Sequence, residues 1–466
     1  MLQPEVHQSS SLHLNHTDEV GSQGLDMDRE RGNREFSSWF LSTAEDILSP
    51  SPSEQGLVSM EESGISSSHS SSQLAQKSLI FPKEDMELDK GLSILHLLKA
   101  LGEAMENENK ELERVILKRL EKKANLNGAA IQRLVFYLIQ SLDKHLSSLT
   151  KEAIKNYEVG FRAFYQIFPY GRFAHFIANS LILEALPGDA ETIHILDFDM
   201  GEGVQWAPLI EALGKQSPGT MRLVSIKCDN CASVPPLQNF EKTQKRLCEH
   251  AHLSGLELKV EEMDMDGLAS EMKKMKMPGR KDWFAFNCMV GLPHMGRVRS
   301  ARLVTEFLKV AEQSINASKR IPNSTINGGI LTFGHGHGME EAVSDCCDFG
   351  STFEQQLSHV TALLESMEWQ MPFLEEARTA MECLFMAPFV SSLACFEKLE
   401  ERACPGGFLP EMALDPWRVS NDVILEAKQL VREGNSPYWI RSEGQSENQV
   451  LLCFLGTPLV RVSSWS

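Results

Sequence analysis

The sequence predicts an α/β fold in which helices surround a mostly parallel β-sheet whose last strands run antiparallel. Two features lead to this prediction. Between residues 192 and 333, short apolar runs alternate with helical stretches, as in parallel strands joined by right-handed crossovers. Beyond residue 437, three apolar runs follow one another without intervening helices, which indicates antiparallel pairing. Helical segments at 86–190 and 339–407 are expected to form an α-helical cap on this core.

We expect residues 1–85 to be a disordered, Ser-rich N-terminal region. The segment is rich in Ser, His, Gln, Glu and Asp, so it cannot bury enough apolar area to offset the entropy lost on ordering. Residues 35–48 stand out because apolar side chains recur there near helical spacing among acids. They suit either a helix that folds into the groove of a partner or an isolated apolar cluster. These side chains are Phe36, Trp39, Phe40 and Ile47.

From residue 86 the sequence takes on the three- and four-residue leucine spacing of an amphipathic helix. Two more helices are expected within 110–142. Two aromatic-rich helices, at 156–168 and 173–186, are separated by Pro169, which cannot donate a hydrogen bond inside a helix. The first leucine stripe is either part of the core of the cap or a surface for a partner. It consists of Leu92, Leu95, Leu98 and Leu101.

The predicted α/β core comprises residues 191–338 and 408–466. Its early strands are covered on both faces, so each reads as a short apolar run between amphipathic helices. A parallel sheet that ends in an antiparallel hairpin is the arrangement of Rossmann-like, methyltransferase-like proteins. We expect the cap to lie over the carboxyl edge of this sheet, with a groove between cap and core. The expected strands are 193–198, 221–227, 256–260, 283–288, 329–333, 438–441, 450–455 and 459–462.

The corner between the first strand and the next helix is the main candidate for a ligand site. Asp197 ends the strand, and two glycines follow where the backbone must turn tightly. In open parallel sheets a nucleotide-like ligand lies at this corner, against the helix N-terminus. Asp199 and Glu202 would repel a phosphate, so S-adenosylmethionine matches this corner better than a dinucleotide does. The alternative is that the glycines only allow the helix and the strand to pack closely. The candidate ligand-binding residues are Asp197, Asp199, Gly201, Gly203, Gln205, Trp206 and Asp229, the last near the position of a ribose-binding acid.

No catalytic residue, cofactor or metal site is predicted. Cys228 and Cys231 have the spacing of half a zinc knuckle, and His335 and His337 offer two imidazoles at a strand end. The two halves are far apart in the sequence and lack a second Cys-x-x-Cys pair, which argues against zinc. The acids at the strand ends could serve an enzyme, but the sequence indicates no acceptor substrate for one.

The net charge of −19 argues against broad electrostatic attachment to nucleic acid, although basic clusters remain at 273–276, 280–281 and 297–302. The basic run at 118–123 suits nuclear import or a solvated helix face. Ten cysteines without regular spacing, and no apolar leader, indicate a reducing compartment. No apolar run approaches the ~20 residues that span a bilayer, so we expect a soluble protein without a membrane partner.

Several short motifs resemble those of a known family. Residues 193–197 read Ile-His-Ile-Leu-Asp, and Gly-Val-Gln-Trp follows at 203–206. They resemble the VHIID motif of the GRAS family of plant transcriptional regulators, with Ile and Leu in place of Val and Ile. Other blocks follow the family order: 168–179 resembles the segment before VHIID, 385–389 lies in the region of the PFYRE block, and Ser464-Trp465 is similar to the closing SAW motif.

The resemblance covers roughly residues 86–466, and residues 199–206 and 286–294 are most similar to the nodulation-signalling pathway 2 branch. It implies a nuclear transcriptional regulator that assembles with other GRAS proteins, reaches DNA mainly through partners and acts in root symbiosis. In this family the first leucine-rich region is associated with dimer formation, which here implies the stripe from Leu92 to Met105. The alternative function is a small-molecule-binding or S-adenosylmethionine-dependent methyltransferase-like protein that uses the Asp197 corner.

Overall fold

The structure is a computed structural model. It describes residues 83–142, 148–216, 219–227, 239–274, 282–295, 301–319, 328–336, 349–394, 413–444 and 447–466. The N-terminal region that is predicted to be disordered, including the apolar segment 35–48, lies outside the described residues. Residues 83–85 are an exception, because the first described helix, α2 (Lys83–Glu106), already begins there.

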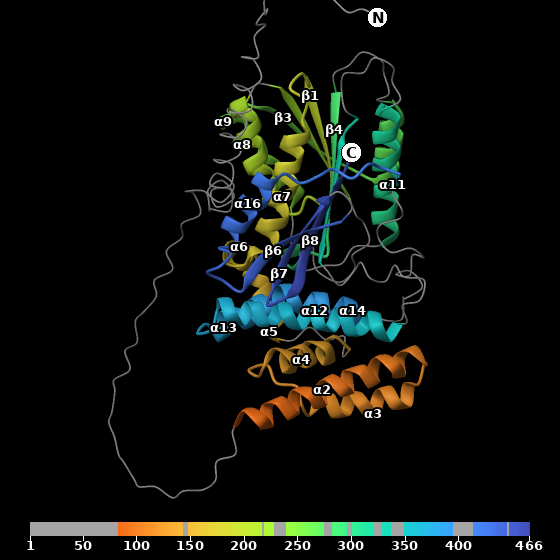
Figure 1. The fold of residues 1–466 in the computed structure, drawn as a ribbon, viewed down its shortest axis with the longest axis vertical. Helices are drawn as coiled ribbons and strands as arrows, with labels where there is room; N and C mark the ends of the chain where they lie inside the picture. The colour runs from red at the N-terminus through yellow and green to blue at the C-terminus, as the bar shows by residue number, and fades with distance from the viewer. Residues whose placement is uncertain are drawn as a thin grey trace, which may run out of the picture.

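The described strands form one eight-stranded sheet in the order β3-β2-β1-β4-β5-β8-β7-β6 (Figure 1). Strands β1 to β5 pair in parallel, whereas β8 is antiparallel to β5, β7 to β8 and β6 to β7. This confirms the predicted Rossmann-like class, with a mostly parallel sheet and antiparallel C-terminal strands. The strands are β1 (Thr192–Phe198), β2 (Thr220–Ile226), β3 (Glu257–Met263), β4 (Asp282–Val290), β5 (Ile330–Gly336), β6 (Tyr438–Glu443), β7 (Gln449–Phe454) and β8 (Thr457–Trp465).

Helices cover both faces of the sheet, which is why its central strands, such as β1 and β4, are apolar on both sides. Ile193 and Ile195 of β1 belong to the core that includes α7 (Pro169–Ala185) and α8 (Trp206–Gln216). The alternating residue Leu196 faces the opposite core, which α11 (Ala301–Lys319) supplies. The helices α9 (Phe240–Leu253) and α16 (Asn421–Leu430) lie on the α7 side, and α10 (Met265–Lys274) packs with α11.

The cap consists of two layers of helices beyond one end of the sheet (Figure 1). The inner layer includes α12 (Phe349–Gln370), which contacts β8, and the outermost helices are α2 and α3 (Lys110–Glu121). The short helix η2 (Pro293–Met295) follows the carboxyl end of β4 and contacts α6 and η5, so the cap lies at the carboxyl edge, as predicted. The remaining cap helices are α4 (Ala130–Leu142), α5 (Ser148–Lys155), α6 (Tyr157–Ile167), α13 (Glu375–Met381), the π-helix η5 (Glu382–Met386) and α14 (Ala387–Ala394).

The prediction placed residues 86–190 in the cap, but helix α7 of this range belongs to the core. Pro169 is its first residue, where the missing N–H is harmless, and the helix then contacts β4, β5, β7 and β8. The physical reason is that α7 is buried on nearly all of its faces, so it is a layer of the core rather than an amphipathic cap helix.

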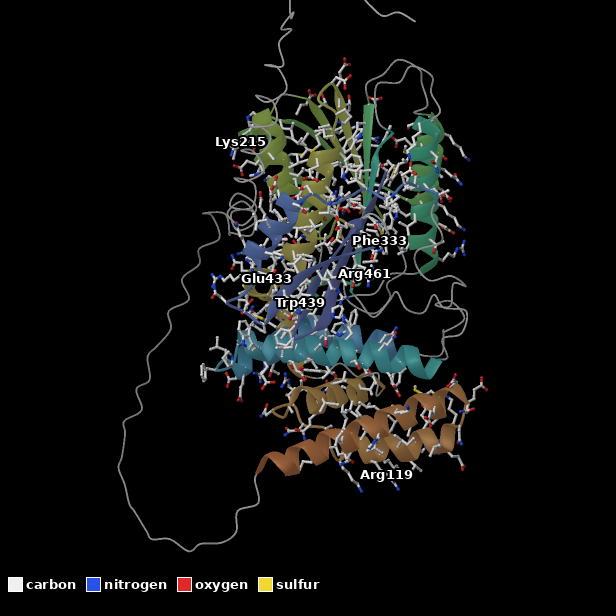
Figure 2. All side chains as sticks on the ribbon, in the orientation of Figure 1. Arg119, Lys215, Phe333, Glu433, Trp439 and Arg461 are labelled. Carbon is white, nitrogen blue, oxygen red and sulfur yellow. The ribbon has the colours of Figure 1, made fainter. Side chains whose placement is uncertain are left out.

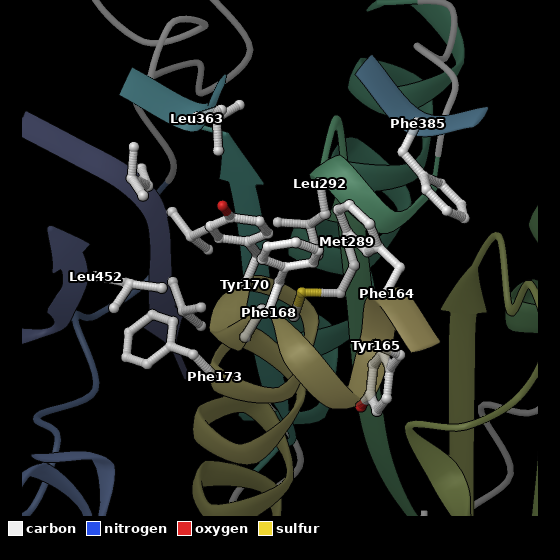
Figure 3. Close-up of a cluster of buried hydrophobic side chains, with 14 of the residues drawn as sticks. Phe164, Tyr165, Phe168, Tyr170, Phe173, Met289, Leu292, Leu363, Phe385 and Leu452 are labelled. Atoms are coloured by element: carbon white, nitrogen blue, oxygen red, sulfur yellow. The ribbon is translucent and has the colours of Figure 1, made fainter. Parts of the chain in front are cut away.

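An aromatic cluster joins the cap to the core (Figure 3). Phe164 of α6 lies 4.3 Å from Phe385 of η5, measured between ring centroids, and 4.7 Å from Phe168. Phe168 stacks on Tyr170, whose hydroxyl is hydrogen-bonded to Ser366 of α12. Because these side chains are buried and come from both sides of the junction, the cap is packed onto the core rather than tethered to it.

Candidate functional site

Asp197 lies in a row of buried polar side chains that crosses the middle of the sheet. It pairs in register with Asn287 of β4, and Asn287 pairs with Thr332 of β5. Asn287 Nδ2 donates to Asp197 Oδ1 at 2.7 Å, and Thr332 Oγ1 donates to Asn287 Oδ1 at 2.9 Å. The register of the parallel strands therefore brings together three polar groups that the sequence separates widely.

The start of α8 completes this network. Trp206 Nε1 donates to Asp197 Oδ2 at 2.7 Å, so both oxygens of Asp197 accept hydrogen bonds. The side-chain amides of Gln205 and Asn287 bond to each other in both directions, at 3.1 and 3.2 Å. Asn179 of α7 donates to the Gln205 carbonyl at 2.6 Å and accepts from its side-chain amide at 3.3 Å. We call Asn179, Asp197, Gln205, Trp206, Asn287 and Thr332 the corner network.

Burial gives the acid of the corner network an unusual titration. Desolvation raises the pKa of Asp197 to about 7, and the nearby Asp199 adds to the increase. The hydrogen bonds from Asn287 and Trp206 act in the opposite direction, because they stabilise the carboxylate. The surrounding donors are neutral, so no cation restores the ordinary pKa.

The glycines of the corner permit tight turns and close helix packing. Asp199, Gly201 and Gly203 all have positive φ, of 75°, 59° and 70°. A Cβ on Gly203 would lie 2.8 Å from Cγ2 of Thr243 in α9, closer than real contacts allow. The packing interpretation of Gly203 thus has a specific physical basis at this position.

A small cavity separates the corner from the cap. Its volume is about 20 Å³, enough for one water molecule but far below the hundreds of Å³ of a pocket for a nucleoside-sized ligand. Asp199, Gly201 and Gln205 line it, whereas Asp197 and Trp206 do not, and Asp229 lies outside the described residues. The remaining lining residues are Phe161, His175, Met200, Glu202, Val204, Met289, His294 and Met295.

Two histidines that the sequence analysis did not single out border this cavity. The rings of His175 and His294 meet edge to face, with 5.0 Å between centroids, and Tyr165 Oη is 2.9 Å from Nδ1 of His175. Burial lowers the pKa of both, that of His294 to about 3. Gly171 makes room for His294, because a Cβ there would be 2.6 Å from its Nδ1. Their only sequence signal was their place within the family-like blocks 168–179 and 286–294.

The other candidate chemistry of the sequence is only partly described. Cys228, Cys231 and His337 lie outside the described residues, and His335 is buried, with Nδ1 2.9 Å from the carbonyl of Gly336. Within the described ranges no group of three or more His, Cys, Asp or Glu side chains is placed to hold a metal ion. Of the basic clusters, Arg302 is exposed and pairs with Glu306 at 2.9 Å. None of the described helices is long and apolar enough to cross a membrane.

A second buried polar group, absent from the sequence analysis, fastens the cap. Arg133 of α4 and Glu382 of η5 are fully buried and lie 3.2 Å apart, Nε to Oε1. Tyr137 Oη donates to Glu382 Oε2 at 2.9 Å, and Arg378 Nε lies 3.6 Å from Oε1. Arg133 also pairs with Glu368 of α12 at 2.9 Å. We call Arg133, Tyr137, Arg378 and Glu382 the cap clamp, because it ties α4 to the helices of the 349–394 segment.

The leucine stripe is divided between the inside and the outside of the cap. Leu98 and Leu101 are buried, whereas Leu92 and Leu95 are 48% and 50% exposed. The physical reason is that a step of three residues falls about 60° short of a full helical turn, so four such positions span about half the circumference. The two exposed leucines lie on α2, in the outermost layer of the molecule.

Comparison with known proteins agrees with the motifs. The model of the GRAS domain family matches residues 94–466. Protein NODULATION SIGNALING PATHWAY 2 of Medicago truncatula is 27% identical over 407 residues, covering 81% of this chain and 76% of that protein. The protein of the same name from Lotus japonicus is 27% identical over 402 residues, with the same coverage.

Among solved structures, the crystal structure of SCL7 in Oryza sativa has a TM-score of 0.57 and 21% sequence identity. The match covers 80% of this chain and 99% of that chain, so the two proteins share a fold. Because the family match spans most of the sequence, the resemblance read from the short motifs is confirmed, and the chain belongs to the GRAS domain family.

Proposed function

We propose that this chain is a nuclear transcriptional regulator that assembles with other GRAS proteins and reaches DNA mainly through them. A role in nodulation signalling follows from its similarity to Protein NODULATION SIGNALING PATHWAY 2 of two species, each matched over 81% of this chain. As a GRAS family plant regulator, the chain acts through surfaces that other proteins recognise.

The observation that carries the assembly is the position of Leu92 and Leu95. They lie three residues apart on the outermost helix, each about half exposed, while Ile94 and Leu98 anchor the same helix in the core of the cap. A partner that covers such a pair gains apolar burial without unfolding the cap. The cap clamp supports this role because it holds the layers beneath α2 in place.

The corner network supports regulation rather than chemistry at Asp197. Both oxygens of this acid are taken by donors of the fold, and Trp206 and Gln205 are taken by the same network. Glu202, the further acid of the loop, pairs with Arg246 of α9 at 3.0 Å. These side chains are used in holding β1, β4 and α8 together.

The proposal is tested with the variant Leu92→Glu/Leu95→Glu and a panel of GRAS proteins that includes DELLA protein 1 of Medicago truncatula. Because both side chains are half exposed, we expect the helix signal and the melting temperature to stay unchanged while capture of partners falls at least about 10-fold. Leu425→Glu, at another half-exposed leucine on α16, is the matched control and should bind as the wild type does. If the double variant captures partners as well as the wild type does, α2 is not the partner surface. If a fluorescent fusion of the chain is found in the cytoplasm and not in the nucleus, the proposal of nuclear action is rejected.

A further inference from the structure

We infer that two copies of this chain also associate through a charge-complementary contact away from the leucines of α2. One side is the α12–α13 corner (Trp369, Phe373, Leu374, Glu375 and Glu376). The other is the α3 face (Leu112, Val115, Lys118, Arg119 and Lys122). This contact rests on the proposed function, assembly with GRAS proteins, and specifies a second copy of the chain as one such partner.

The α12–α13 corner is an apolar projection with an acidic border. Phe373 is 93% exposed, and Leu374 and Trp369 beside it are about half exposed. The indole of Trp369 packs edge to face on the buried Tyr438, 6.0 Å between centroids, which fixes the corner against the sheet. Glu375 and Glu376 begin α13, are exposed, and form no ion pair within the described parts of the chain.

The α3 face has the opposite charge and comparable apolar character. Leu112 and Val115 are about half exposed, while Ile116 and Leu120 bury the other side of the helix. Lys118 and Arg119 occupy the last turn, one helical turn beyond Val115, and Lys122 follows them; all three are exposed. Figure 2 shows Arg119 on the outer side of the cap. Among the described residues these three cations have no acidic partner, unlike Lys110, which pairs with Glu113 at 3.2 Å.

The charges and positions of these two surfaces select a second copy as the occupant. An aromatic and a leucine bordered by acids match a partner surface that is apolar and bordered by cations, and the α3 face has this composition. Both surfaces lie at the cap end of the molecule, so a two-fold arrangement can form the contact twice (Figure 1). In a chain with a net charge of −19, a local basic face is also what lets two copies approach each other.

The test is sedimentation velocity of the full-length chain over a range of concentrations and salt. Phe373→Ser, Glu375→Lys/Glu376→Lys and Lys118→Glu/Arg119→Glu should each raise the dimer dissociation constant about 10-fold or more. Combining the two charge reversals in one chain should restore it to within about 3-fold of wild type, because opposite charges meet again. The control Lys245→Glu/Glu249→Lys reverses an exposed pair on α9, at the other end of the molecule, and should change nothing.

The outcomes separate this contact from the proposed function. A monomer at all concentrations, a dimer that ignores these substitutions, or reversals that weaken binding without mutual rescue would each overturn the contact. If Leu92→Glu/Leu95→Glu abolishes capture of GRAS partners in those cases, the proposed function stands without it. Rescue by the combined reversal supports the contact even if the single reversals perturb the fold, because an unfolded chain does not regain a dimer.

Discussion

The corner network and the cap clamp each contain one buried acid, but their surroundings differ. Asp197 is held by the neutral donors of Asn287 and Trp206, on elements that the sheet already places side by side. Glu382 faces two guanidinium groups and a tyrosine that lies 245 residues away in the sequence. The corner network therefore reinforces a structure that strand pairing has already formed, whereas the cap clamp, together with apolar packing, joins helices that no strand pairing places side by side.

The largest effect should come from breaking the cap clamp. Glu382→Leu leaves the buried guanidinium of Arg133 with only the partly exposed Glu368 as a counter-charge, which should cost up to about 3–5 kcal/mol of unfolding free energy. Arg133→Met/Glu382→Leu removes both charges of this pair and should recover part of that loss, because an apolar pair needs no counter-charge; the rest remains because Arg378 has also lost its partner Glu382. Urea unfolding followed by circular dichroism measures both. Equal stability of Glu382→Leu and wild type would mean that the clamp contributes nothing to the junction.

A smaller effect should come from titrating the corner network. Burial raises the pKa of Asp197 from 3.8 to about 7, so the folded state holds this proton more tightly than the unfolded state. The associated stability is therefore complete below about pH 4 and is lost as pH rises through 7, by about 4 kcal/mol at 1.36 kcal/mol per unit.

Unfolding free energies of wild type and Asp197→Asn between pH 5 and 8 isolate this contribution, because other titrating groups cancel in the difference. The wild type should lose stability relative to the variant as pH rises, and the fluorescence of Trp206 should change over the same range, since its indole N–H bonds to the carboxyl. A difference that is flat with pH would contradict the raised pKa.

Much of the sheet could be predicted from the sequence, because strands buried on both faces leave short apolar runs that helices separate. Helix α16 was missed, although Ser420 caps it by accepting from the N–H of Val423 at 3.2 Å. Helix α7 was assigned to the cap, although it is buried on nearly all of its faces and belongs to the core. In each case the deciding signal was local capping or burial on all faces, to which apolar periodicity is not sensitive.

The candidate site was harder to predict because its partners are brought together by register and by packing. Asp197, Gln205 and Trp206 are close in the sequence and were identified, but Asn287 and Asn179 reach them only once β4 and α7 are in place. Arg133 reads as an exposed residue of an amphipathic helix until its partner Glu382 is known. The stripe from Leu92 to Leu101 is treated in the sequence as one unit, either core or partner surface, whereas the helical pitch buries Leu98 and Leu101 and exposes Leu92 and Leu95.

In this account the cap carries the surface that partners bind, and the corner network is structural. Hydrogen exchange, followed by mass spectrometry on the full-length chain with and without the GRAS protein that it captures best, distinguishes these two roles. Slower exchange in α2 around Leu92 and Leu95, with unchanged exchange from Asp197 to Trp206, is the result that we predict. Protection confined to residues 197–206, with α2 unchanged, would contradict the claim and place the partner or a ligand at the corner.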